Sequence, residues 1–424
     1  MRKSVIAAVP LLAAAALAIS GCSGPAEANT TSAPATPFPV ALQLSTVPKG
    51  LEVGVVLSLT SPVGEGSEWE QAAEGAQVAA WQLRKGGTAV TLKVIDDKGT
   101  TDGAVAAVND LAKQHVSAIV FATSGPHLDQ ALTAASQARI PALLPYGWRQ
   151  RALPADAWST GPGADAVQAT TRNVLTRLKA QHPVTINVGS ATPDADAANT
   201  ITVAPGANTG DLTAALKSRL DAANADAVVI DGDASQQALV VAAIQGTGLN
   251  LPIVFSPDAV SPAFPAALST AAASLTGNYW TVGAPDSDGT ALVANTDGQA
   301  VSAFLAAVRL AAADSKFTNL TGDQPFSTAA ASADIGSHDA LLAIVAAASM
   351  AGSSASADII TALGGLTLTH KNGLAGPTLD FAHAQALGGK SVVPLQASTQ
   401  NAGLRPASAS PAPTLDWFAA PGRS

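Results

Sequence analysis

The chain has 424 residues and a formal net charge of −9 at pH 7, with 47% apolar and 12% charged residues. An acidic chain without a cluster of basic residues is a poor candidate for binding nucleic acid or an anionic membrane surface. Its single cysteine excludes intramolecular disulfides and cysteine-based metal sites, so the fold must be stabilised by its apolar core.

The first residues have the pattern of a secretory signal peptide. Two basic residues precede an apolar run from Val5 to Ile19, which is shorter than the ~20 residues that a membrane-spanning helix needs. The motif Ile19-Ser20-Gly21-Cys22 then resembles the lipobox of bacterial lipoproteins, in which the cysteine carries a diacylglycerol and becomes the first residue after cleavage. We predict a signal peptide over 1–21 and lipidation of Cys22, because two acyl chains anchor a protein stably where one does not. The alternative is a buried or stray cysteine near a cleavage site.

A polar segment follows the cysteine. It is rich in Ala, Thr, Ser and Pro and has no hydrophobic periodicity, so it cannot bury a core. We predict that residues 22–48 form the lipidated cysteine and a flexible tether. About 375 residues remain, more than a single core usually contains, so two lobes are expected.

Strand and helix patterns alternate through the first half of this body. The strands are nearly continuous apolar runs, as in EVGVVLSL from Glu52 to Leu59. Such runs, separated from helices by short loops, indicate a parallel sheet covered by helices on both faces. The predicted strands cover 52–59, 89–95, 117–122 and 140–144, and the predicted helices cover 68–83, 102–114 and 127–138.

The alternation starts again in the second half and predicts an α/β fold with two doubly wound lobes. Gly- and Pro-containing segments near 146–163, 279–285 and 373–377 indicate a hinge that the chain crosses several times. We place the first lobe at 49–160 and 281–365, and the second at 161–280 and 366–424. The predicted helices cover 170–180, 211–223, 235–245, 335–352 and 357–363, and the strands cover 184–188, 227–231 and 252–255.

No enzyme motif is visible. The chain has no G-x-S-x-G nucleophile motif and no phosphate-binding P-loop, and its six histidines lack the spacing of metal ligands. GPGADA from Gly161 to Ala166 fits a dinucleotide-binding pattern, but no predicted strand precedes it. Asp96 and Asp97 could form a metal pair, although a turn after a strand is the favoured interpretation. We therefore predict a protein that is not an enzyme and that has no cofactor and no metal.

Five segments carry a resemblance to a known family over roughly 52–381. They resemble, in order, parts of the substrate-binding proteins of ABC transporters of the branched-chain amino acid type, which have the type I periplasmic binding protein fold. The segments are VGVVLSLTSPVGEGSEWEQAAEGAQVAAWQL, LKVIDDKGTTDGAVAAVNDLA, VSAIVFATSGPHLDQALTAASQARIPALLPYG, DALLAIVAAASMAG and GLAGPTLDF.

The resemblance implies an amino acid held at both ends between the lobes. Its carboxylate would meet Ser124 and Gly125 in the turn ATSGPH, where backbone N–H groups before a helix attract an anion. Its ammonium group would meet Asp258 in FSPDAV. Alternatively, Ser124 or Thr123 caps a helix, and Asp258 is a solvated turn residue.

Aromatic residues mark a departure from this family. Tyr146, Gly147 and Trp148 occupy positions where the family has a small residue followed by Thr or Ser, and Trp69 lies near the family's first-loop aromatic. Trp69 could also simply pack on its helix. Because Tyr146 and Tyr279 are the two tyrosines of the chain, the family's second-lobe tyrosines are absent. These changes weaken the case for leucine, isoleucine or valine as the ligand.

Together these features predict a monomeric solute-binding lipoprotein, lipid-anchored to the outer face of the cytoplasmic membrane. It would capture a small polar ligand, an amino acid or a related molecule, and deliver it to an ABC transporter permease, with no nucleic-acid partner. The alternative is a ligand-sensing or cell-envelope interaction lipoprotein with a degenerate pocket.

Overall fold

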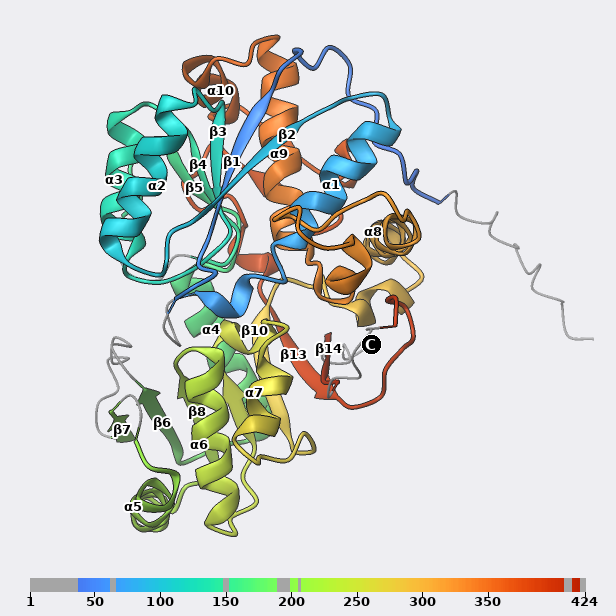
Figure 1. Ribbon diagram of the computed structural model, residues 1–424. Helices are drawn as coiled ribbons and strands as arrows, with labels where there is room; N and C mark the ends of the chain where they lie inside the picture. The colour runs from blue at the N-terminus through green and yellow to red at the C-terminus, as the bar shows by residue number, and fades with distance from the viewer. Residues whose placement is uncertain are drawn as a thin grey trace, which may run out of the picture. The chain divides into compact units, whose positions relative to one another are not determined.

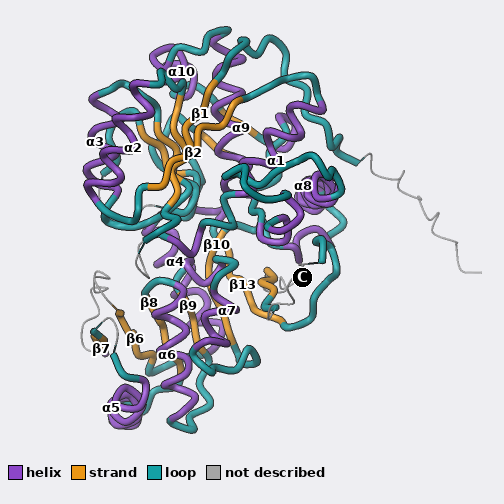
Figure 2. The backbone as a smooth tube through the Cα atoms, in the orientation of Figure 1, coloured by secondary structure: helices purple, strands orange, loops and turns teal. Residues whose placement is uncertain are grey.

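The computed structural model describes residues 37–61, 66–147, 152–188, 199–204, 207–407 and 414–419. The predicted signal peptide, Cys22 and Trp148 lie outside these ranges. Residues from Pro37 onward form one compact unit, whose elements are labelled in Figure 1 and coloured by type in Figure 2.

The first lobe is built on a parallel sheet of five strands in the order β2-β1-β3-β4-β5. Successive strands lie on both sides of β1, as in a doubly wound fold, and the central strands are buried along most of their length. The strands are β1 Glu52–Leu57, β2 Thr91–Asp96, β3 Ala118–Phe121, β4 Ala142–Leu144 and β5 Ala157–Ser159.

Helices cover both faces of this sheet (Figure 1). One face packs against α2 (Thr101–Lys113) and α3 (Leu128–Gln137). The other packs against α1 (Glu74–Lys85) and α9 (Ile335–Ala351), and α9 is buried on nearly every side, as its almost wholly apolar sequence requires. Two further helices, α8 Thr296–Ala312 and α10 Ser356–Leu363, pack beside α1 and α9.

The second lobe repeats this strand order and extends it. Its sheet has seven strands in the order β14-β13-β10-β9-β8-β6-β7, and the first five in sequence are parallel. Strands β13 and β14 add antiparallel pairs at the edge. The strands are β6 Pro183–Val188, β7 Thr200–Val203, β8 Ala227–Asp231, β9 Ile253–Phe255, β10 Tyr279–Gly283, β13 Val393–Ser398 and β14 Asp416–Ala419; the helices are α4 Ala164–Leu178, α5 Thr209–Ala222, α6 Ala234–Gly246 and α7 Phe264–Thr270.

The predicted fold class is confirmed, but the first helix differs from its prediction. In place of one helix over 68–83, a 3-10 turn at Ser67–Trp69 precedes α1, which begins at Glu74. The Ala72 carbonyl accepts hydrogen bonds from Asp334 N and Ser337 Oγ at the start of α9. Because these tertiary bonds take the carbonyl that an earlier first turn would use, the regular helix starts later.

The chain crosses between the lobes at positions that differ from the predicted boundaries 281 and 366. Strand β10 lies wholly in the second sheet, so the second crossing follows Gly283. Residues 366–388 pack on the first lobe, with Leu366 and Phe381 in the core around α9, so the third crossing follows Gly388. This segment contains the short hairpin β11 Thr367–Leu368 and β12 Leu379–Asp380.

The end of the predicted tether is part of the first lobe. Leu42 is 8% exposed, and its backbone N–H donates to the Gln82 carbonyl. The Gln82 side chain donates to the Val40 carbonyl at 2.9 Å, and Ser349 Oγ donates to the Ser45 carbonyl. Residues around Leu42 therefore follow a fixed path along α1 and α9.

Within the described part of the chain, no single helix is both long and apolar enough to cross a membrane. Helices α9 and α10 meet these two criteria only as a pair, and a 102° bend separates them.

Leu42 should contribute measurably to stability. We expect Leu42→Ala to lower the free energy of unfolding by about 2 kcal/mol, because this buried leucine would lose its packing against Leu342 and Gly373. Urea denaturation followed by circular dichroism measures this change. Gln43→Ala, at an exposed neighbouring position, is the control, and equal losses in both variants would contradict a packed segment.

Candidate functional site

Ser124 lies beyond the carboxyl ends of the strands of the first sheet, in the loop between β3 and α3. Its Oγ accepts a hydrogen bond from the Trp69 indole Nε1 at 2.9 Å. A serine hydroxyl has one hydrogen and two lone pairs. Since the indole uses a lone pair, the Ser124 hydrogen is left to donate to another acceptor.

Trp69 and Tyr146 form an aromatic stack beside this serine. Their ring centroids are 4.0 Å apart with an interplanar angle of 13°, and Trp69 is 4% exposed. Trp69 reaches the Ser124 loop because the backbone at Gly66, three residues earlier, packs directly against Thr123 and Ser124. A Cβ at Gly66 would lie 1.8 Å from Thr123 Oγ1, and its φ of 91° also favours glycine. The structure thus brings together three predicted site residues of the first lobe: Trp69, Ser124 and Tyr146.

The capping alternative for Ser124 and Thr123 is wrong. The residue that precedes α3 is His127, and no side-chain cap bonds the first turn of this helix. Thr123 Oγ1 instead lies 2.6 Å from Ser58 Oγ. Gly125, also in this loop, has a φ of 142°, which other residues rarely adopt.

Carboxyl groups gather on the other side of Tyr146. Burial, and then the negative charge of Asp334, raise the pKa of the Tyr146 hydroxyl well above its usual range. Burial raises the pKa of Asp334 to about 6, although Ser337 hydrogen bonds to this carboxyl. Burial and the nearby charge of Asp334 raise the pKa of Asp286, at the second crossing, to about 7. Burial near the hinge thus makes each of these groups harder to ionise than it is in water.

Gly147 marks the closest approach of two hinge segments. A Cβ at Gly147 would lie 2.7 Å from the Pro162 carbonyl, and a Cβ at Gly161 would lie 2.3 Å from the Pro145 carbonyl. A strand, β5, does precede GPGADA, contrary to our prediction. Its glycines permit this backbone packing, and Gln385 Nε2 donates to the Gly161 carbonyl at 2.6 Å. The motif therefore serves the first crossing between the lobes.

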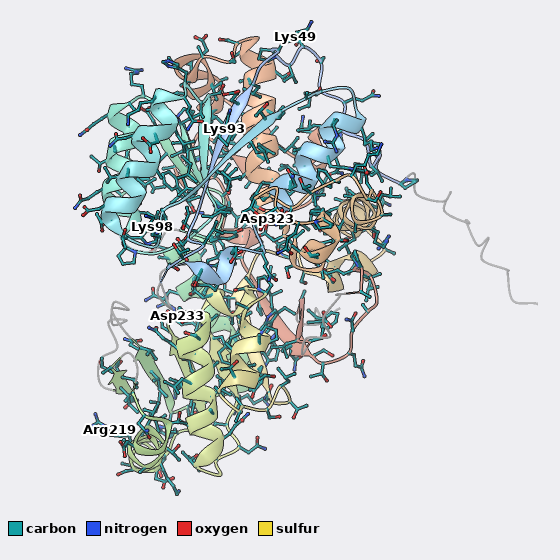
Figure 3. All side chains as sticks on the ribbon, in the orientation of Figure 1. Lys49, Lys93, Lys98, Arg219, Asp233 and Asp323 are labelled. Atoms are coloured by element: carbon teal, nitrogen blue, oxygen red, sulfur yellow. The ribbon has the colours of Figure 1, made fainter. Side chains whose placement is uncertain are left out.

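Asp258 occupies the matching edge of the second sheet. It lies in a 3-10 turn, Pro257–Val260, directly after β9. Its side chain accepts a hydrogen bond from Ser256 Oγ at 3.0 Å, and the residue is 8% exposed. The alternative of a solvated turn residue is therefore wrong. The nearby Asp233, labelled in Figure 3, instead caps α6 by accepting from Ser235 N and Gln236 N.

One hydrogen bond joins the two lobes beside these residues. Ser261 Oγ, three residues after Asp258, donates to the Glu68 carbonyl at 2.6 Å. Glu68 immediately precedes Trp69. The turns that contain Trp69 and Asp258 therefore touch, although they belong to different lobes.

Asp96, the last residue of β2, and Asp97, which follows it, hold a turn, as the favoured interpretation predicted. Asp96 accepts from Leu59 N at 2.9 Å and from Lys98 N at 2.8 Å. Asp97 accepts from Ser58 Oγ at 2.7 Å and pairs with His127. In the described ranges, no group of three His, Cys, Asp or Glu side chains could hold a metal ion.

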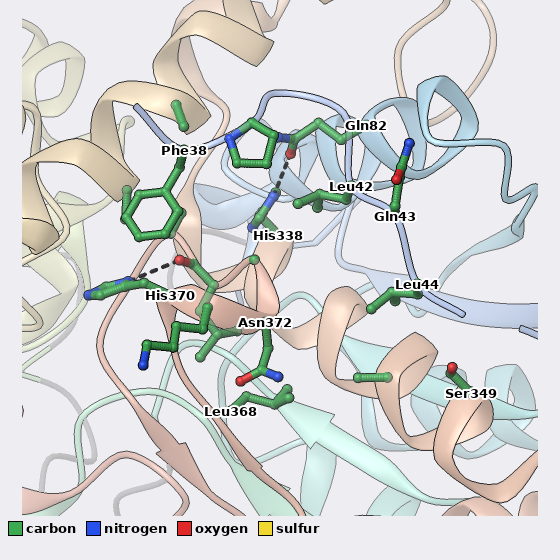
Figure 4. A pocket seen from close by; sticks show the side chains of 18 of the residues that line it. Phe38, Leu42, Gln43, Leu44, Gln82, His338, Ser349, Leu368, His370 and Asn372 are labelled. Carbon is green, nitrogen blue, oxygen red and sulfur yellow. Dashed lines mark hydrogen bonds between the residues drawn. The ribbon is translucent and has the colours of Figure 1, made fainter. Parts of the chain in front are cut away.

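A large pocket lies elsewhere in the first lobe. It has a volume of about 710 Å³ and runs between the segment around Leu42, α9 and the segment around Asn372. Gln82 and His338 are hydrogen-bonded in its wall (Figure 4). Of the predicted ligand residues that the structure describes, none lines this pocket. We place the candidate site by the contacts of Ser124, Trp69 and Asp258, because these residues lie near the carboxyl ends of the parallel strands, where ligands bind in such folds.

Solved structures with the type I periplasmic binding protein fold are similar to this chain. One, the type 1 periplasmic binding protein from Bordetella pertussis Tohama I, has a TM-score of 0.61 and 16% identity, over 83% of this chain and 97% of its own. The branched-chain amino acid transporter substrate-binding protein LivJ from Streptococcus pneumoniae, in complex with isoleucine, has a TM-score of 0.60 and 18% identity, over 88% and 100%. A fatty acid ABC transporter substrate-binding protein from Thermomonospora curvata has a TM-score of 0.58 and 15% identity, over 84% and 90%. No protein-family model and no curated protein sequence matches the chain. These likenesses establish the fold.

The buried acids predict a pH dependence of stability. Asp286 and Asp334 have raised pKa values, about 7 and about 6, so the folded chain retains protons that the unfolded chain releases above its usual pKa of about 4. The free energy of unfolding should therefore fall as the pH rises from about 4 to about 7. Asp286→Asn stays neutral at every pH, so between pH 5 and pH 8 we expect its free energy of unfolding to rise by about 2–3 kcal/mol relative to that of the unaltered protein.

Urea denaturation at both pH values measures this gain. The control is Asp110→Asn, at an exposed position on α2. If Asp286→Asn and the unaltered protein lose stability in parallel, Asp286 does not hold the proton.

Proposed function

We propose that this protein is an extracytoplasmic solute-binding protein that captures a small polar ligand between its two lobes and passes it to an ABC transporter permease. The observation that supports this most directly is the Ser124 hydroxyl. One of its lone pairs accepts from Trp69, and its hydrogen remains available to donate at the carboxyl ends of the strands of the first sheet. A donor at this position suits a carboxylate or another anionic group.

The opposite end of the ligand would meet Asp258. This carboxylate is largely shielded from water and lies in the turn that touches the Trp69 turn. A shielded carboxylate binds an ammonium group well, since such hydrogen bonds gain strength away from water. Ser124 and Asp258 together therefore suit a zwitterion such as an amino acid, with Gly125, Tyr146, Gly147 and Trp148 as further proposed contacts. Trp148 lies outside the described residues.

The hinge supplies the means of capture. Three crossings join the lobes, and the first contains close glycine contacts at Gly147 and Gly161. A ligand that contacts both lobes favours the closed arrangement by its differential affinity for it. A permease would then recognise the closed shape.

One observation favours a second candidate function. Trp69 already contacts both Ser124 and Tyr146 closely. If this stack persists, it fills space that a small ligand needs, and the fold would then serve as a sensing or cell-envelope interaction lipoprotein with a degenerate pocket.

A ligand screen separates ligand binding from the cell-envelope interaction function without a working pocket. We expect one compound from a panel of L-amino acids, including L-leucine, L-isoleucine and L-phenylalanine, to raise the melting temperature of the full chain. A ligand at about 100 times its dissociation constant adds about 2.7 kcal/mol of stability. For the compound that binds, Asp258→Ala or Ser124→Ala should weaken affinity by roughly tenfold to a hundredfold, since each removes a partner of a charged group.

The control for these variants is Asp110→Ala, at an exposed position remote from the site. Unchanged affinity in Asp258→Ala would contradict the proposal that Asp258 binds the ammonium group of the ligand. No stabilisation by any compound would favour the cell-envelope interaction function.

The lipid anchor gives a separate prediction, based on the lipobox-like motif before Cys22. We expect Cys22→Ser to leave the precursor uncleaved or to release the protein from the membrane, because serine cannot accept the thioether-linked lipid. Cell fractionation and immunoblotting of tagged protein measure this. Mature, membrane-bound Cys22→Ser protein would contradict the anchor.

A further inference from the structure

A continuous buried network lies under the Ser124 loop. Thr123 Oγ1 and Ser58 Oγ are 2.6 Å apart, and Ser58 Oγ donates to Asp97 Oδ1 at 2.7 Å. Asp97 Oδ2 lies 3.0 Å from His127 Nε2. All four side chains are buried, with Asp97 at 0% and His127 at 4% exposure.

The chemistry of the four groups fixes the direction of each bond. Ser58 has one hydroxyl hydrogen, which it gives to Asp97, so Thr123 must donate to Ser58. The carboxylate of Asp97 only accepts, so His127 Nε2 carries a hydrogen. Donors therefore converge on Asp97 from both sides, and Gly99 N adds a third at 2.8 Å. Hydrogen bonds aligned in this way strengthen one another.

The network ties together four separate pieces of the first lobe. Ser58 follows β1, Asp97 follows β2, Thr123 follows β3, and His127 precedes α3. These pieces include both ends of the loop that carries Ser124. Because Asp97 is buried, loss of one of its donors would leave a charge without compensation, and the loop would have to move to restore it.

Trp69 depends on the same network through Gly66. The Gly66 backbone packs against Thr123 Oγ1 and the Ser124 backbone. Trp69 N donates to the Gly66 carbonyl at 3.1 Å, which starts the turn that aims the indole at Ser124. A shift of Thr123 would therefore move both partners of the Trp69–Ser124 hydrogen bond.

We propose that Asp97 and His127 are positioning residues, which hold the Ser124 hydroxyl and the Trp69 indole in the arrangement that the ligand meets. The purpose of this positioning rests on the proposed solute-binding function, whereas the positioning itself can be measured without any ligand.

The Trp69 indole N–H is a direct probe of this arrangement. The chain has six tryptophans, so the full chain labelled with ¹⁵N gives few indole signals, and Trp69→Phe identifies the signal of interest by its loss. In Asp97→Asn and in His127→Leu we expect this signal alone to shift and its exchange with water to become about tenfold faster. His127→Gln restores a side-chain N–H donor and should return the signal toward its original position.

Two comparisons make the outcome decisive. Asp110→Asn removes an exposed carboxylate of the same lobe and should leave the Trp69 signal unchanged. Ser58→Ala breaks the network without removing a charge, so it tests the proposal even if Asp97→Asn does not fold. An unchanged Trp69 signal and exchange rate in folded Asp97→Asn or Ser58→Ala would overturn the positioning role.

The outcome of this experiment does not depend on whether the proposed function is correct. If no compound in the ligand screen binds but the Trp69 signal responds as described, solute binding is wrong and positioning stands. If a compound binds and Trp69 does not respond, the reverse holds.

Discussion

The candidate site depends on one buried carboxylate. Asp97 accepts hydrogen bonds from Ser58, Gly99 and His127, and so joins the ends of strands that the sheet brings to the same edge. An unpaired charge in this position would be costly, so the carboxylate holds its donors in place. Ser124 and Trp69 take their positions from that edge. The aromatic stack on Tyr146 then follows from where Trp69 lies.

Near the hinge, in contrast to Asp97, the buried carboxyl groups have few groups that compensate their charge. Asp286 and Asp334 lie near one another, and burial raises the pKa of both. Ser337 compensates Asp334 in part, and the same Ser337 bonds the Ala72 carbonyl at the start of α1. Acids with raised pKa values reduce stability near neutral pH. The first lobe thus combines a fully paired carboxylate under the Ser124 loop with poorly compensated carboxyls near the hinge, where movement is proposed.

The sequence predicted the strands and helices well where apolar runs are long and buried. Strand β8 matches its predicted range at both ends, and α9 differs by one residue. The three-residue strand β5 escaped prediction because so short a segment carries little periodicity. The six-residue strand β13 was not predicted either. The resemblance identified Ser124 and Trp69 singly. The Asp97–His127 pair was missed. Asp97 directly follows β2 and His127 lies in the connection after β3, so the position of both residues beyond the carboxyl ends of parallel strands was the available signal.

By itself, the sequence determined that the body is an α/β protein with two similar units and no disulfide. Apolar periodicity and cysteine content depend only on local composition, so they can be read without coordinates. The tertiary structure decided which side chains meet. Thr123 reaches Ser58 and Asp97 reaches His127 only because β1, β2 and β3 lie side by side and end at one edge. Leu42 leaves the predicted tether for the core because α1 and α9 offer it a buried place. Contacts between residues far apart in the chain depend on this strand order, which no local pattern encodes.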